Sequence, residues 1–143
     1  MLEIEKDRKT KTAVICPVIK TAAGMMTAEE EAARENEAVG LVLAMGQEVV
    51  FCETVRMSAI VPKSFFGKGT LERLKTACEE KGAELLVVDM PVSAVQQRNL
   101  EKMLNMKVID RTAVILEIFG QRAQTREGKL QVELAHLTYQ RGR

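Results

Sequence analysis

The feature that most constrains the fold is an alternation of short apolar runs with segments of helical periodicity. The apolar runs are TAVICPVI at 12–19, EVVFCETVRM at 48–57, ELLVVD at 84–89 and KVID at 107–110. β-Branched residues are frequent in them, which is typical of strands covered on both faces. Strands that alternate with helices pair in parallel through right-handed crossovers. The sequence therefore predicts an α/β fold with a four-stranded parallel sheet, helices on both faces and the strand order 2-1-3-4.

Capping residues and glycines mark the predicted helices between these strands. Thr27 and Ser93 each stand three residues before a Glu or a Gln, which is the capping-box pattern of a helix start. Gly46 and Gly82 follow periodic segments and suit the left-handed position after a helix end. Pro17 is awkward inside the first strand, because it has no N–H to donate. We expect either that the strand ends near it or that Pro17 lies on a locally unpaired stretch.

A long final helix is predicted from Thr112, because about thirty positions contain no proline and no cluster of turn residues. At 1.5 Å per residue such a helix spans about 45 Å, more than the width of the sheet, so it would start a helical arm. Its first apolar residues, Ile115, Ile118 and Phe119, are expected to pack on the sheet. A second apolar stripe further along would lack a partner helix in this sequence and could support self-association: Leu130, Leu134 and Leu137.

The chain is long enough for one core, and we expect three segments. These are a flexible N-terminus at 1–11, an α/β N-terminal domain at 12–110 and the long helix at 111–143. No apolar run approaches the roughly 20 residues that span a membrane, and the first residues are charged. We therefore expect a cytoplasmic protein that does not bind membranes.

The cysteines and the single histidine give no sign of a metal site or of catalysis. Cys16, Cys52 and Cys78 are far apart and form no CxxC motif, so they are interpreted as buried, inert thiols. His136 has no cysteine beside it and is interpreted as an ordinary helical residue. We assign no metal ligand and no catalytic residue.

Charge is distributed unevenly along the chain. The chain has 21 Lys and Arg and 20 Asp and Glu. Residues 111–143 contain six of the basic and three of the acidic residues, and residues 1–110 contain the other fifteen basic and seventeen acidic ones. The final helix is therefore basic and the preceding domain slightly acidic. This asymmetry predicts an anionic partner for the helix.

Two aspartates are expected at the carboxyl edge of the sheet, where open α/β sheets usually bind ligands. Asp89 ends the third predicted strand and Asp110 ends the fourth. A magnesium or ribose contact is one interpretation. The favoured one is that Asp89 braces the turn before Pro91 and that Asp110 caps the final helix.

Residues 93–139 resemble the N-terminal region of the HflX family of ribosome-associated GTPases. The resemblance is carried by QQRNLE at 96–101, VIDRT at 108–112 and ILEIFGQRAQTREGKLQVELAHL at 115–137. The upstream segment FFGKGTLERLK is similar to a glycine-containing segment of the family. Mild departures are Glu117, Gly120 and His136, where the family favours Asp, Ala and Gln.

The resemblance implies a longer protein that is a translation factor. In it, this domain precedes a helical hairpin, whose first half would be the final helix, and then a GTP-binding domain that holds GTP and magnesium. The family binds the large ribosomal subunit, and it helps to split or rescue stalled ribosomes. No G-x-x-x-x-G-K-[ST] motif occurs in the 143 residues, so we expect no GTPase activity from this sequence and no cofactor in it.

On this interpretation, basic residues of the final helix contact phosphates of ribosomal RNA without reading its sequence. The alternative is a solvated face, or ion pairs with a second hairpin helix or with neighbouring acids. The candidate RNA-binding residues are Arg122, Arg126, Lys129, Arg141 and Arg143.

A second candidate site, for ATP or GTP, precedes the helix predicted from about Thr70. Gly67, Lys68 and Gly69 could hold a phosphate on backbone N–H groups at the helix start. The alternative is a plain connection between strand and helix.

Overall fold

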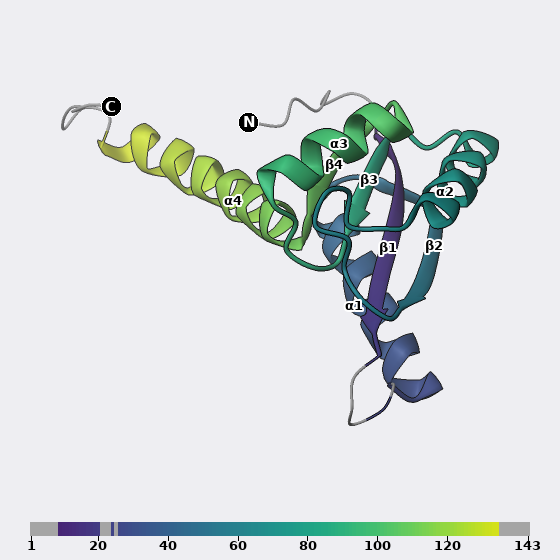
Figure 1. Ribbon diagram of the computed structural model, residues 1–143. Coiled ribbons are helices and arrows are strands. Elements are labelled where there is room, and N and C mark those ends of the chain that lie inside the picture. The colour runs from purple at the N-terminus through teal and green to yellow at the C-terminus, as the bar shows by residue number, and fades with distance from the viewer. Residues whose placement is uncertain (1–8, 21–23, 25, 135–143) are drawn as a thin grey trace.

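The computed structural model describes residues 9–20, 24 and 26–134, and side chains as far as residue 123 (Figure 1). It contains a four-stranded, all-parallel sheet in the order β2-β1-β3-β4, as the sequence predicts. Residues 1–8 of the predicted flexible N-terminus lie outside the described residues. The strands are β1 Lys11–Ile19, β2 Glu48–Met57, β3 Leu85–Val88 and β4 Lys107–Asp110.

Helices cover both faces of the sheet, which confirms the predicted fold class. One face is packed by α1 and α4, and the other by α2 and α3. Beyond its first turns α4 extends away from the sheet as an arm (Figure 1). The helices are α1 Ala28–Ala44, α2 Lys68–Lys81, α3 Ala94–Leu104 and α4 Arg111–Leu134.

Two apolar cores lie on opposite faces of β1, because successive side chains of a strand point to opposite sides. Ala13 and Ile15 point into the core under α2 and α3, which includes the fully buried Leu100. Val14 and Cys16 point into the core under α1 and α4. Burial on both sides explains why these strands read as continuous apolar runs.

Pro17 lies on a locally unpaired side of β1, the second of the two predicted alternatives. The N–H of Asp89 donates to the carbonyl of Ile15, which is the last pairing of β1 towards β3. Pro17, two residues further on, faces the same side beyond the end of β3, so no strand needs its missing N–H. On its other side, towards β2, Pro17 is paired with Val55.

The predicted caps of α1, α2 and α3 are confirmed, although α2 begins at Lys68 rather than at about Thr70. Both capping boxes form, with the N–H of Glu30 donating to Thr27 Oγ1 and the N–H of Gln96 donating to Ser93 Oγ, each at 3.1 Å. Gly82 ends α2 with a φ of 72°, a left-handed backbone conformation that residues other than glycine rarely adopt.

Two predicted core residues are exposed instead. The apolar spacing of α3, Leu100, Met103 and Leu104, predicts that Met103 is buried, but its side chain is 44% exposed, and Phe119 of α4 is 60% exposed. In α3 the buried row is Gln96, Leu100 and Leu104, at a spacing of four residues, and Met103 flanks it. Apolar periodicity therefore marks the correct helices but makes their buried stripes too wide.

Candidate functional site

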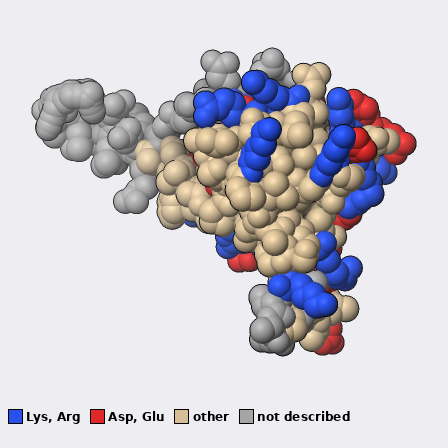
Figure 2. All heavy atoms as spheres, in the orientation of Figure 1, with Lys and Arg blue, Asp and Glu red and all other residues tan. Residues whose placement is uncertain are grey.

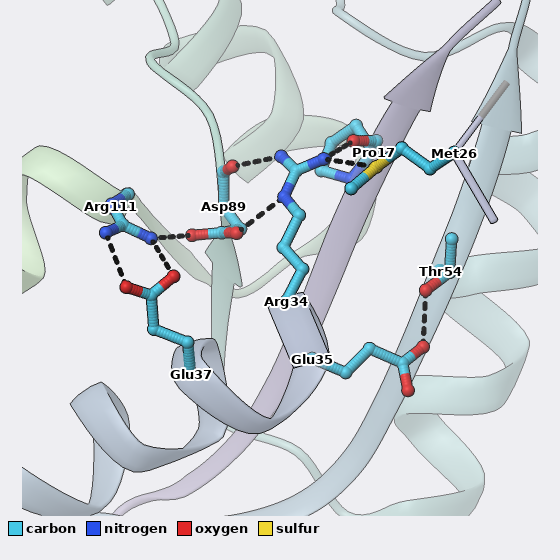
Figure 3. Close-up of polar contacts among 8 residues, drawn as sticks. All are labelled: Pro17, Met26, Arg34, Glu35, Glu37, Thr54, Asp89 and Arg111. Carbon is cyan, nitrogen blue, oxygen red and sulfur yellow. Dashed lines mark hydrogen bonds and ion pairs between the residues drawn. The ribbon is translucent and has the colours of Figure 1, made fainter. Parts of the chain in front are cut away.

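A buried carboxylate holds the carboxyl edge of the sheet together (Figure 3). Asp89 follows β3 and is only 4% exposed. Arg34 of α1 donates from Nε to its Oδ2 at 3.0 Å, and Arg111 of α4 donates from Nη1 to its Oδ1 at 3.1 Å. Each carboxylate oxygen therefore accepts from a guanidinium, which compensates for the loss of hydration.

Arg34 also satisfies backbone carbonyls that the sheet leaves open. Its Nη1 donates to the carbonyl of Pro17 at 2.7 Å, and its Nη2 donates to the carbonyl of Asp89 at 2.8 Å. The guanidinium thus takes the place of a neighbouring strand where β3 has ended (Figure 3). These two contacts connect α1 both to β1 and to the end of β3.

Arg111 bridges to a second acid on α1. Its Nη1 and Nη2 donate to Glu37 Oε1 and Oε2, both at 3.3 Å. These hydrogen bonds and the charge of Arg111 lower the pKa of Glu37, and the hydrogen bonds of Glu37 and Asp89 raise the pKa of Arg111. The first residue of α4 is therefore fixed to both α1 and β3.

Asp110 caps α4, as the favoured interpretation predicts. Its Oδ1 accepts from the N–H of Ala113 and its Oδ2 from the N–H of Val92, each at 3.0 Å. The corresponding interpretation of Asp89 is wrong, because its carboxylate bonds to Arg34 and Arg111 rather than bracing the turn before Pro91.

This cluster of ion pairs is a structural junction, because its donors and acceptors already bond to one another. Among the residues that the structure describes, no group of three or more His, Cys, Asp or Glu side chains could hold a metal ion. Sequence reasoning missed Arg34 and Glu37, which are separated from their partners by 55 and 74 residues. The only local signal was the single arginine among the acids of the first helix.

The candidate nucleotide site lies at the start of α2, where it differs from the other helix starts. Gly67 is the N-cap and makes no side-chain hydrogen bond, whereas α1 and α3 both have capping boxes. Its φ of −70° is open to any residue, and a Cβ added at Gly67 or Gly69 would meet no atom within 4 Å. The backbone conformation therefore does not require these glycines, and Lys68 beside them is exposed.

The candidate RNA-binding residues lie on α4 or beyond it. Arg122 is exposed, and positions 126 and 129 follow it at spacings of four and three on one side of the helix. The side chains of Arg126 and Lys129 lie beyond those described, as do those of Leu130 and Leu134. Arg141, Arg143 and Leu137 lie outside the described residues.

The thiols are mostly protected by the fold. Cys16 and Cys78 are buried and Cys52 is half-buried. Burial raises the pKa of Cys78 to about 11, so this thiol stays protonated at neutral pH.

Comparison with known proteins identifies the family. Residues 32–120 match the family described as GTP-binding GTPase N-terminal. The chain is 47% identical over 108 residues to GTPase HflX of Magnetococcus marinus, and this alignment covers 76% of this chain and 25% of that protein. It is 43% identical over 104 residues to GTPase HflX of Escherichia coli, and this alignment covers 73% of this chain and 24% of that protein. The chain belongs to the HflX GTPase family.

The match places this HflX chain in the N-terminal domain of the family, as the resemblance predicted. The chain spans about a quarter of the length of the two HflX relatives named above. The matched residues 32–120 include Arg34, Asp89, Asp110 and Arg111, so the whole junction lies within the family domain.

A solved structure supports the fold of this HflX domain. The GTP-binding protein from the archaeon Sulfolobus solfataricus, in complex with GDP, superposes with a TM-score of 0.53 and 22% identity. The superposition covers 90% of this chain and 36% of that protein. Among the described residues of the HflX chain, no helix is long and apolar enough to cross a membrane.

We predict that Asp89→Ala destabilises the domain by about 3–5 kcal/mol, because it leaves two guanidinium groups without their buried partner. The measurement is urea denaturation followed by circular dichroism. Glu53→Ala is the matched control, since it breaks the more exposed pair with Arg73 and should cost about 0–1 kcal/mol. Equal losses for the two variants would contradict the structural role of the junction.

Proposed function

We propose that this HflX domain binds the large ribosomal subunit through phosphates of ribosomal RNA and has no GTPase site of its own. The observation that carries the proposal is the α4 arm, considered together with the family. The arm projects from the sheet (Figure 1). Arg122 on it is exposed, and positions 126 and 129 continue the same side of the helix. Cationic side chains on a projecting helix can reach phosphates that the sheet body cannot.

The junction supports this role because it holds the base of the arm. Arg111 and Asp110 fix the first turn of α4 to α1, β3 and the loop after it. A fixed base limits the directions in which the arm can point, which lowers the ordering cost of binding.

GTP hydrolysis is assigned by this proposal to another part of the parent protein. The sequence has no G-x-x-x-x-G-K-[ST] motif, and the relatives named GTPase HflX are about four times longer than the aligned region. On this view the parent is a cytoplasmic GTP hydrolase that uses GTP and magnesium in its own GTPase domain. Its proposed task is to split or rescue stalled ribosomes, with this domain as the contact to RNA.

We predict that the chain co-sediments with large ribosomal subunits at low salt and is released as salt is raised, because counterion release dominates phosphate binding. Replacing Arg122, Arg126 and Lys129 together by Gln should weaken binding about ten-fold or more and make it less salt-dependent. The control replaces three exposed lysines at the two ends of the sheet, Lys11, Lys20 and Lys81, by Gln and should bind like the parent. A folded chain that does not bind at low salt would refute the proposal.

Nucleotide binding at the start of α2 is the second candidate function, favoured by the missing side-chain cap at Gly67. The first N–H groups of a helix that lacks a capping side chain can donate to a phosphate. If this function holds, calorimetric titration with ATP or GTP should detect binding that Gly69→Val abolishes. A Gly40→Val variant is the control, because position 40 is also an open helical glycine but lies on α1. Absence of heat with both nucleotides would dismiss this candidate.

A further inference from the structure

Helices α1 and α3, on opposite faces of the sheet, carry opposite charge. Helix α1 has one basic residue, Arg34, against five acids, whereas the outer side of α3 and the segment before α2 are basic. The acids of α1 are Glu29, Glu30, Glu31, Glu35 and Glu37. Because α1 and α3 cover opposite faces of the sheet, these two helices present opposite charge on opposite sides of the domain.

Two basic residues lie on the outer side of α3. Leu100 and Leu104 are buried against the sheet at 0% and 4% exposure. Arg98 and Lys102 are exposed, and they lie one helical turn apart on the opposite side. Neither was singled out by the sequence analysis, because two cations in a mixed helix resemble an ordinary solvated face.

A third basic residue is held beside them by hydrogen bonds from α3 to the loop that precedes α2. Asn99 Nδ2 donates to the carbonyl of Lys63 at 2.9 Å, and Gln96 Nε2 donates to the carbonyl of Val61 at 3.1 Å. The exposed Lys63 therefore lies next to the middle of α3. We call Lys63, Arg98 and Lys102 the α3 basic strip.

The α3 basic strip is not neutralised by the acids that the structure describes. Within residues 9–20, 24 and 26–123, Arg34, Arg56, Arg73 and Arg111 all form ion pairs, whereas the side chains of the strip form none. The acid nearest in sequence, Glu101, accepts from the N–H of Val108 at 3.1 Å and so turns towards β4. Figure 2 shows Lys and Arg side chains over α3, with most of the visible Asp and Glu over α2, beside further Lys and Arg.

We infer that the α3 basic strip is a second phosphate-contact surface, which binds structured ribosomal RNA together with the α4 arm. This inference rests on the proposed function and adds to it a face that the α4 residues do not include. Three exposed cations that lie together, and that no described acid pairs, can jointly replace counterions at phosphates, whereas lysines scattered over the ends of the sheet cannot act together. The large exposed side chains of α3 are aliphatic, Val95 and Met103, so the contact is with the backbone rather than with stacked bases.

The acidic α1 face gives the contact a direction. Glu31 and Glu37 are paired with Arg56 and Arg111, but Glu29, Glu30 and Glu35 form no ion pair within the described residues. These three carboxylates repel phosphates, so an RNA partner that approaches from the α1 side is disfavoured and one that approaches α3 is favoured. Specific binding therefore presents α3 to the RNA and leaves α1 facing away from it.

The test replaces Lys63, Arg98 and Lys102 together by Gln and measures co-sedimentation with large ribosomal subunits at several salt concentrations. We expect binding to weaken about ten-fold or more at low salt, and the slope of log affinity against log salt to fall by about 2–3 in magnitude. The control variant, with Lys11, Lys20 and Lys81 replaced by Gln, has the same net charge as the Gln variant of the strip. It should nevertheless bind like the parent. The charge-retaining variant K63R/R98K/K102R should also bind like the parent.

Each other outcome overturns the inference in a distinguishable way. If the parent binds and the Gln variant of the strip matches the control, the strip inference fails while the proposed function stands. If the variant weakens binding without changing the salt slope, the strip contacts a protein surface rather than phosphates, and the inference fails. If the folded parent does not bind, the proposed function and the strip inference fall together.

Discussion

The buried carboxylate of Asp89, held between two guanidinium groups, is the interaction on which the arrangement of this domain depends. A charge removed from water is costly unless it is paired and hydrogen-bonded, and Asp89 has both kinds of compensation. Its two arginine partners come from α1 and α4, so one side chain joins the helices of one face to the end of β3. The same contacts satisfy the carbonyl of Pro17, where β1 continues past its neighbour.

The junction also explains how α4 can follow β4 without a loop. Asp110 ends the strand and Arg111 begins the helix, so the chain must change direction between adjacent residues. The cap from Asp110 to Ala113 and the pairing of Arg111 with Asp89 and Glu37 hold that change in place. The direction of the arm is therefore set by the same residues that close the carboxyl edge, where Asp89, Arg34 and Arg111 are already bonded to one another. Anion binding is proposed for the α3 basic strip and for α4 instead.

Local patterns in the sequence predicted most of the fold. Apolar runs and caps such as Thr27 and Ser93 depend on neighbours within a few residues, and the parallel order followed from their alternation. The pairing of Arg34 with Asp89 spans 55 residues and could not be recognised before the strands were placed. Pro17 could be interpreted only once β3 was known to end near Ile15. The prediction that Phe119 packs on the sheet was wrong, because a periodic pattern does not distinguish an apolar residue beside the buried row from an apolar residue within that row.

The site was less predictable than the fold, because binding depends on which charges remain unpaired. Lysines and arginines are spread over the sequence, and only the structure distinguishes Arg56, paired with Glu31, from Arg98, which is unpaired among the described residues. The RNA-binding candidates on the arm, Arg122 among them, stay predictions. The family resemblance is confirmed by the comparisons, in which the family model matches residues 32–120, and the ribosomal partner is proposed from it.

Ultraviolet crosslinking of the chain bound to large ribosomal subunits tests the orientation on the ribosome most directly. Mass spectrometry of the digested complex identifies the peptides joined to nucleotides. We predict ribosomal RNA adducts in peptides of α3 and α4, and none in peptides of α1. Adducts confined to α1, or a bound chain that yields none in α3 and α4, would contradict this orientation.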